Sequence, residues 1–168
     1  MENILEVQKK AFLKEGPPSL EKRTDLLKRC VALIETHQDK IIKALNQDFQ
    51  NRSVDEIKIS EIDQTIRNIL FTIKKLNKWM QPQRRFSSLG TDLLGAKSIL
   101  QPSPLGTVGI IAPWNFPVGL IFYPLASIFA AGNRAMVKPS EITPATSNII
   151  KEGVAKYFDI SELAVITG

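Results

Sequence analysis

The first 80 residues carry a hydrophobic pattern with helical spacing. Near the start, apolar side chains recur every three or four residues, as on one face of a helix, at Ile4, Val7, Ala11 and Phe12. After Gly16-Pro17-Pro18, Ser19 can cap a second helix. That helix is predicted from one continuous apolar stripe, formed by Leu26, Cys30, Leu33, Ile34, His37, Ile41 and Leu45.

A third helix is predicted from Val54 to Met80, ending before Gln81-Pro82, because a residue before proline disfavours the helical conformation. Its apolar side includes one charged residue, Glu61. We expect Glu61 to extend toward solvent or to pair with a lysine or arginine, and the sequence assigns it no role.

From Gln83 onward, β-branched residues cluster between prolines and glycines, which predicts strands alternating with helices. The apolar run Gly106–Ala112 is typical of a strand covered on both faces. The other elements expected here are a short strand at Lys97–Gln101, a helix over Pro117–Ala131 with Pro124 inside it, a strand at Arg134–Lys138, a helix over Pro144–Tyr157 capped by Thr143, and a strand at Leu163–Ile166.

This alternation predicts an α/β fold, with amino-terminal helices followed by the first part of a Rossmann-like parallel sheet. Such a sheet binds its ligand beyond the carboxyl ends of its strands. The turns that matter are therefore those after Ala112, after Val137 and at Gly168.

Composition supports a globular protein and argues against several other classes. Of 168 residues, 43% are hydrophobic and 23% charged, and the net charge of +5 is spread along the chain without a long basic run. We therefore expect no nucleic-acid partner. The most apolar stretch is too short to cross a bilayer, and residues 1–14 do not resemble a signal peptide, so we expect no membrane partner and a cytoplasmic location. The single cysteine excludes an internal disulfide, and no metal site is expected.

The first important turn reads Pro113-Trp114-Asn115-Phe116-Pro117. Two prolines stiffen a short loop at the start of a helix, where the Asn115 amide could donate to developing negative charge. The alternative is that Asn115 only satisfies the turn and Trp114 packs in the core.

The second turn reads Lys138-Pro139-Ser140-Glu141. At the carboxyl end of a strand, Glu141 could accept hydrogen bonds from ribose hydroxyls and Lys138 could donate to a ribose or phosphate oxygen. The alternative is an ordinary surface ion pair beside a helix.

Taken together, the two turns and their surroundings resemble the aldehyde dehydrogenase family in letters, order and spacing. The resemblance rests on Pro104-Leu105-Gly106-Thr107-Val108-Gly109, Pro113–Pro117, Ala130-Ala131-Gly132-Asn133 and Lys138–Glu141, and it covers the whole chain. Thr143-Pro144-Ala145-Thr146-Ser147 is most similar to the coniferyl aldehyde dehydrogenase branch, near the class 3 enzymes.

The resemblance implies NAD(P)-dependent oxidation of an aldehyde to a carboxylic acid, and the branch resemblance implies an aromatic, coniferyl-type aldehyde. Asn115 matches the family's oxyanion-hole asparagine, and Lys138 and Glu141 match residues that bind the adenosine ribose. The positions that match the crevice floor near the nicotinamide are Ile111, Ala112, Pro113 and Trp114. A carboxylate at Glu141 would repel a 2′-phosphate, which favours NAD over NADP.

The family's catalytic cysteine and glutamate come later in the sequence than Gly168. We therefore expect this chain to be the amino-terminal portion of a longer enzyme, without a catalytic domain and inactive alone. Within it, the expected divisions are a helical region over residues 1–82, an oligomerisation-arm-like segment over 83–104, with Leu93–Gln101 most arm-like, and the first βαβαβ part over 105–168. The resemblance implies a homo-oligomer, dimer or tetramer.

Two other residues could be mistaken for catalysts. Cys30 and His37 both lie on the apolar stripe of the second helix, so we expect a buried structural thiol and a core or boundary histidine. Two alternatives to an enzyme stay open: a non-catalytic nucleotide-binding domain, and a basic nucleic-acid binder.

Overall fold

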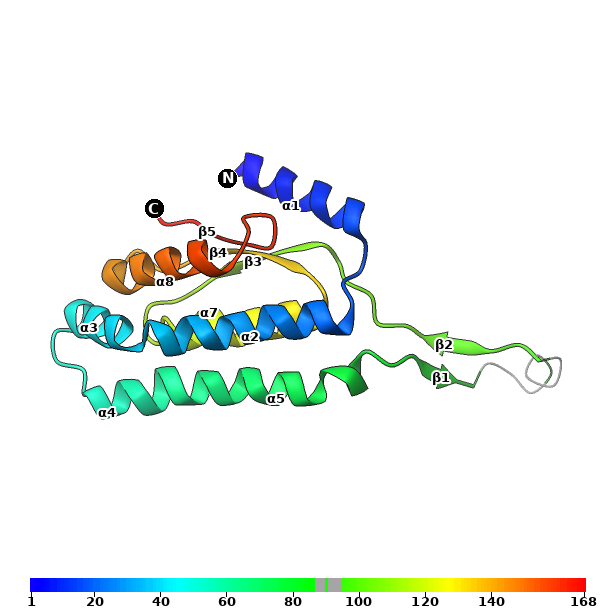
Figure 1. The fold of residues 1–168 in the computed structure, drawn as a ribbon, viewed down its shortest axis with the longest axis horizontal. Coiled ribbons are helices and arrows are strands. Elements are labelled where there is room, and N and C mark those ends of the chain that lie inside the picture. The colour runs from blue at the N-terminus through cyan, green and yellow to red at the C-terminus, as the bar shows by residue number, and fades with distance from the viewer. Residues whose placement is uncertain (87–89, 91–94) are drawn as a thin grey trace.

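The computed structural model describes residues 1–86, 90 and 95–168 (Figure 1). The helical elements of these residues are α1 (Glu2–Glu15), α2 (Leu20–Thr36), α3 (Gln38–Phe49), α4 (Val54–Ile57), the π-helix η1 (Lys58–Asp63), α5 (Gln64–Trp79), α7 (Gly119–Ala130) and α8 (Pro144–Tyr157). The strands are β1 (Gln83–Arg85), β2 (Ser98–Leu100), β3 (Thr107–Ile111), β4 (Arg134–Lys138) and β5 (Leu163–Val165).

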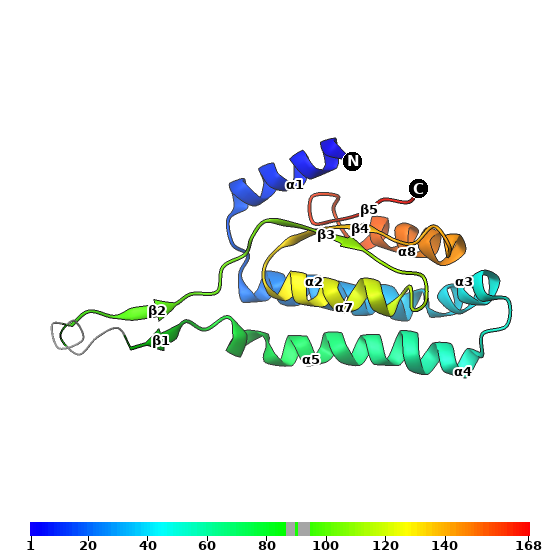
Figure 2. The same cartoon turned by 180° about the vertical axis from the view of Figure 1, so that it is seen from behind.

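The centre of the fold is a parallel sheet with strand order β3-β4-β5. Helices α7 and α8 pack on this sheet, α2 packs on both of them, and α5 packs on α2 and α7. Figures 1 and 2 show these layers on one side of the sheet and α1 on the other. The predicted α/β fold with amino-terminal helices and a parallel sheet is confirmed.

The prediction that β3 is covered on both faces is wrong for this chain. Ile110 is buried, but Gly109 and Ile111 are exposed, and Ile111 keeps 85% of its surface accessible. Helix α1 contacts β3 and β4 without filling that face, and an apolar groove remains between α1 and the sheet. The apolar run therefore predicted the strand correctly, but it did not predict that one of the two faces of the strand is exposed.

The amino-terminal helices differ from the prediction at one point. The single helix expected through Leu45 is broken at His37, whose φ of −102° and ψ of 10° separate α2 from α3. After this break, α3 packs against α8. The apolar stripe continues across the break because both helices face the same core, so periodicity alone could not reveal it.

The helix predicted from Val54 to Met80 is present as continuous helical structure through Trp79, but its first half contains the π-helix η1. A π-helical turn inserts an extra residue and changes which side chains face inward, and such turns are frequent at functional sites. Glu61 lies in this turn.

Strands β1 and β2 form an antiparallel hairpin that projects from the body of the molecule (Figures 1 and 2). Phe86, Ile99 and Leu100 on it are exposed. Part of the arm-like Leu93–Gln101 segment, residues 93 and 94, lies outside the described residues. The division of the chain at residues 82 and 104 stays a prediction.

Candidate active site

Both predicted turns lie at the carboxyl edge of the sheet. Strands β3 and β4 are parallel and pair Ile111 with Lys138, and the Ala112 N–H donates to the Lys138 carbonyl at 3.0 Å. The loop that carries Asn115 and the turn that carries Glu141 therefore leave the sheet from adjacent positions.

The loop between β3 and α7 presents its polar and aromatic residues to solvent. Asn115 is exposed, and Trp114 and Phe116 keep 48% and 38% of their surface accessible. The Trp114 ring lies 6.2 Å from the Phe49 ring. The alternative in which Trp114 is a core residue is not supported. Of the residues expected at the crevice floor, Ala112 is buried, whereas Ile111, Pro113 and Trp114 are exposed.

A buried ion pair between Arg52 and Glu61 contacts the same loop. The Arg52 guanidinium donates to Glu61 Oε1 at 3.0 Å and to the Asn115 carbonyl at 3.3 Å. Glu61 Oε2 accepts hydrogen bonds from the backbone N–H groups of Val118 and Gly119, at 3.1 and 2.9 Å. These N–H groups belong to the start of α7 and have no partner within that helix.

Glu61 is fully buried, with 0% of its surface accessible. Burial raises the pKa of Glu61, and the N–H groups of Gly119 and Val118 together with Arg52 oppose this shift. The expectation that Glu61 pairs with a basic residue is confirmed, but it does not reach solvent.

The second turn carries an ion pair between Lys138 and Glu141, with Nζ and Oε2 2.7 Å apart, which is the feature that the alternative of a surface ion pair predicted. The assignment of these two residues to a ribose site stays a prediction. The hydrogen bond from Lys138 lowers the pKa of Glu141, so this exposed carboxylate is ionised at neutral pH. Glu141 also lines a small hollow, together with Pro139, Ser140, Pro144, Ser147, Asn148, Thr167 and Gly168.

The amino terminus of α8, which begins beside this hollow, is already capped. Thr143 occupies the N-cap position, as predicted, but its side chain makes no capping bond. Instead, the Asp48 carboxylate on α3 accepts from the N–H groups of Ala145 and Thr146, at 3.0 and 2.8 Å. Because a protein carboxylate fills this position, the turn suits neutral hydroxyl groups better than a phosphate.

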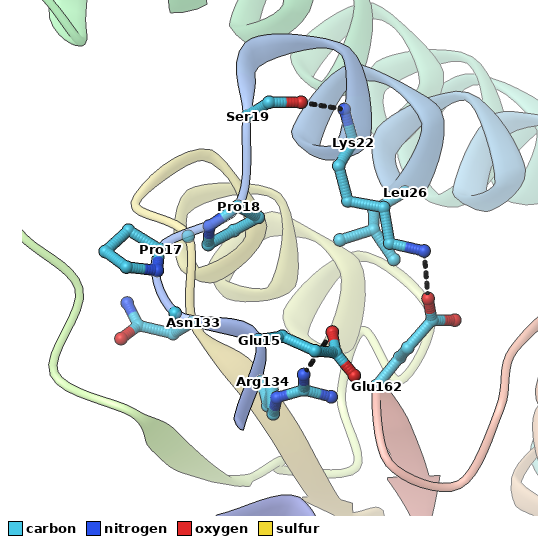
Figure 3. A pocket seen from close by; sticks show the side chains of 11 residues that line it. Glu15, Pro17, Pro18, Ser19, Lys22, Leu26, Asn133, Arg134 and Glu162 are labelled. Atoms are coloured by element: carbon cyan, nitrogen blue, oxygen red, sulfur yellow. Dashed lines mark hydrogen bonds and ion pairs between the residues drawn. The ribbon is translucent and has the colours of Figure 1, made fainter. Parts of the chain in front are cut away.

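A more strongly charged hollow lies at the amino ends of the strands, away from both turns (Figure 3). Arg134, the first residue of β4, pairs there with Glu15 at 2.7 Å, and Glu162 pairs with Lys22 and Arg29. Each of these carboxylates has a cationic partner, so the network links α1 and α2 to the sheet.

This network predicts a loss of stability in acid. Desolvation alone would raise the pKa of Glu162, but hydrogen bonds from Arg29 and Lys22 lower it from 4.5 to about 2. Because the folded-state pKa is below the unfolded value, ionised Glu162 stabilises the fold above pH 4.5, and this contribution disappears as the pH falls toward about 2.

Urea unfolding at pH 6, 4, 3 and 2 tests this expectation. Wild-type chain should be more stable than Glu162→Gln at pH 6, and the difference should shrink as the pH falls. A difference that stays constant over this range would contradict the assigned pairing.

With this geometry described, comparison with known proteins identifies the family. The sequence model of the aldehyde dehydrogenase family matches residues 1–167. The chain belongs to the aldehyde dehydrogenase family. It is 48% identical to a probable coniferyl aldehyde dehydrogenase of Caulobacter vibrioides, over all of this chain and 35% of that protein.

Solved aldehyde dehydrogenases share this fold. The substrate-bound structure of Staphylococcus aureus AldH is 33% identical, with a TM-score of 0.93, over 99% of this chain and 36% of that one. Succinic semialdehyde dehydrogenase from Streptococcus pyogenes, in complex with NADP+, is 18% identical, with a TM-score of 0.83, over 98% of this chain and 35% of that one; this match shows the fold alone. This aldehyde dehydrogenase chain thus spans about a third of the length of its relatives.

The expectations for Cys30 and His37 are confirmed. Cys30 is buried, and burial raises the pKa of its thiol. His37 is 5% exposed, and its Nδ1 lies 3.0 Å from the Leu33 carbonyl. No helix among the described residues is long and apolar enough to cross a membrane.

Three residues that contact the candidate site were not predicted from the sequence: Arg52, Asp48, and Glu61 as the acceptor for the start of α7. The isolated charge at Glu61 on an apolar helix face was the one available signal. Nothing in the local sequence marked Arg52 or Asp48, since their partners lie up to 98 positions away.

Proposed function

We propose that this chain forms the amino-terminal, cofactor-binding part of an enzyme that oxidises an aldehyde to a carboxylic acid with NAD. The observation that carries the proposal is the placement of Asn115 and Glu141 on neighbouring turns at one edge of a parallel sheet. A coniferyl-type aromatic aldehyde is the substrate class we favour, on the basis of the 48% identity to a probable coniferyl aldehyde dehydrogenase.

In the proposed reaction, the exposed Asn115 amide donates a hydrogen bond to the aldehyde oxygen as that oxygen becomes negative. The amino terminus of α7 is already capped by the Glu61 carboxylate, so stabilisation of this charge by the chain rests on the Asn115 amide. NAD, held at the Glu141 turn, would supply the acceptor for the hydride that leaves the thiolate adduct of the aldehyde, and water would hydrolyse the resulting thioester to the acid. The attacking thiolate would have to come from outside this chain, because Cys30 is buried and its raised thiol pKa disfavours the thiolate.

The second turn has the groups that an adenosine ribose requires. The ionised Glu141 carboxylate can accept from two hydroxyls, and the Lys138 ammonium lies 2.7 Å from it, ready to donate to a sugar oxygen. Asp48 adds negative charge at the adjacent start of α8. Both carboxylates disfavour an additional 2′-phosphate, so we infer a preference for NAD over NADP within a family that uses both.

Replacing Glu141 tests the cofactor part of the proposal. In a full-length enzyme that contains this chain, Glu141→Gln should raise the KM for NAD, because a neutral amide is a weaker acceptor for the ribose hydroxyls. It should also reduce the preference for NAD over NADP, by roughly tenfold, because one repulsive charge is removed.

The measurement is kcat/KM for both cofactors, from the absorbance of the reduced nicotinamide. The matched control is Glu152→Gln, an exposed glutamate on α8, which should leave both values unchanged. An unchanged ratio in Glu141→Gln would reject the assigned role of Glu141.

The main alternative is a non-catalytic nucleotide-binding domain. It predicts that a full-length polypeptide binds NAD but forms no NADH with any aldehyde, whereas the enzyme proposal predicts aldehyde-dependent NADH formation. For the 168-residue chain alone, we propose that no aldehyde is oxidised, and NADH formation by it would contradict that proposal.

The projecting β1–β2 hairpin supports a further part of the proposal, a homo-oligomer built through this arm. Its exposed apolar residues are Phe86, Ile99 and Leu100. Exposed apolar residues that lie together mark an interaction surface more often than single ones do, and a second subunit could bury them. The structure fixes no number of subunits, and a cytoplasmic location likewise stays a prediction.

A further inference from the structure

The loop that presents Asn115 makes its polar contacts with a part of the chain far away in the sequence. Arg52 lies between α3 and α4, and Glu61 lies in η1, yet together they contact the middle of the loop and the point where it joins α7. Arg52 reaches the carbonyl of Asn115 itself, and Glu61 reaches the two backbone N–H groups where α7 begins.

Both carboxylate oxygens of Glu61 are used for this purpose. One carboxylate oxygen binds Arg52, and the other accepts from Val118 and Gly119. The side chain is completely buried, so water does not compete for these bonds. Glu61 lies in the π-helical turn η1 and is buried there beside Ile62.

Arg52 is fixed equally firmly. Its side chain is 8% exposed, and its guanidinium lies 5.2 Å from the Phe49 ring centre and 4.7 Å from that of Phe116. Phe116 directly follows Asn115, so Arg52 contacts the loop through both a hydrogen bond and a ring. Movement of Asn115 would break contacts on both sides.

Net stability alone does not account for this arrangement. A buried ion pair often contributes little compared with well-packed apolar residues of similar size. The pair instead imposes a geometry, since it accepts two backbone N–H groups and donates to one carbonyl on a single short loop.

We propose that Arg52 and Glu61 are a positioning pair that holds the Asn115 loop so that its amide meets the aldehyde oxygen. The inference rests on the proposed catalytic role of Asn115 and extends it to residues that touch neither substrate nor cofactor. A misplacement of about 1 Å in a catalytic group can lower turnover by roughly a hundredfold. Loosening the pair should therefore lower kcat without altering the ribose site.

The first test uses the 168-residue chain and ¹⁵N-labelled NMR. Glu61→Gln keeps only one accepting oxygen, so it can accept from Arg52 or from the Val118 and Gly119 N–H groups but not from both. The side-chain NH₂ signals of Asn115 and the backbone amides of Trp114 and Phe116 should therefore shift or broaden. The matched control is Glu162→Gln, which breaks a carboxylate–arginine pair at the opposite end of the sheet and should leave these signals in place. Unchanged Asn115 signals in folded Glu61→Gln would overturn the proposal.

A second variant decides the matter if Glu61→Gln does not fold. Arg52→Lys keeps the positive charge but loses the planar guanidinium, which lies over the Phe49 and Phe116 rings and donates through Nε to Glu56 while Nη1 donates to Glu61 and to the Asn115 carbonyl. It should perturb the same three residues, and unchanged signals in this variant would also overturn the proposal.

The second test uses a full-length enzyme that contains this chain. Glu61→Gln should lower kcat by roughly 10–100-fold, with the KM for NAD unchanged, while Glu162→Gln lowers the melting temperature but not kcat. If Asn115→Ala lowers kcat but Glu61→Gln keeps the wild-type kcat, the positioning pair is rejected and the proposed function stands. If Asn115→Ala keeps the wild-type kcat, the proposed role of Asn115 is rejected. The NMR result then still decides whether Arg52 and Glu61 fix the position of the loop.

Discussion

Substitution of Asn115 by alanine should lower the turnover of a full-length enzyme by about 10²–10³-fold, the usual cost of removing one oxyanion donor. The side chain is exposed at the sheet edge, and its loop is fixed by two prolines and by Arg52, so alanine removes the donor without removing the loop. The KM for NAD should be nearly unchanged, because the proposed ribose site lies on the neighbouring turn.

Steady-state NADH formation with a saturating aromatic aldehyde measures this effect. Asn68→Ala, which removes an exposed amide on α5, is the matched control and should keep wild-type turnover. If Asn115→Ala also keeps wild-type turnover, Asn115 does not stabilise the oxyanion.

The second large effect concerns the helix that follows this loop. Phe122, on α7, is completely buried in the core between the sheet, α2 and α5. Phe122→Ala should reduce the free energy of unfolding of the chain by about 3–5 kcal/mol, through lost burial and the cavity that remains. Since small domains have only about 5–15 kcal/mol in total, this loss should be evident at room temperature.

Urea unfolding followed by circular dichroism gives the free energies for this comparison. Phe71→Ala on α5 removes the same side chain from a position that is 53% exposed, and it should cost far less. Equal losses in the two variants would contradict the described packing of α7.

The sequence predicted the strands and the two turns because local chemistry determines them. Prolines 113 and 139 end apolar runs that form β3 and β4, and Gly132 adopts the left-handed φ of 87° expected where α7 stops. Once the strands are parallel, Asn115 and Glu141 must lie at the same edge.

The remaining features depend on contacts between distant segments. The break at His37 leaves the apolar stripe intact, so the pattern gave no sign of it. The cap of α8 comes from Asp48, 97 positions before Ala145, which no local motif encodes. Glu61 acquires its partners because α7 begins beside η1 and Arg52 lies next to both.

The most direct test of the account compares kcat and the KM for NAD in a full-length enzyme, for wild type, Asn115→Ala, Glu141→Gln and the double variant. The account predicts that wild type oxidises an aromatic aldehyde, that Asn115→Ala lowers only kcat, that Glu141→Gln raises only the KM, and that the double variant shows both effects. The division of roles between the two turns would be contradicted if the wild-type enzyme formed no NADH. It would also be contradicted if Asn115→Ala changed the KM for NAD instead of kcat, or if Glu141→Gln changed kcat instead of the KM.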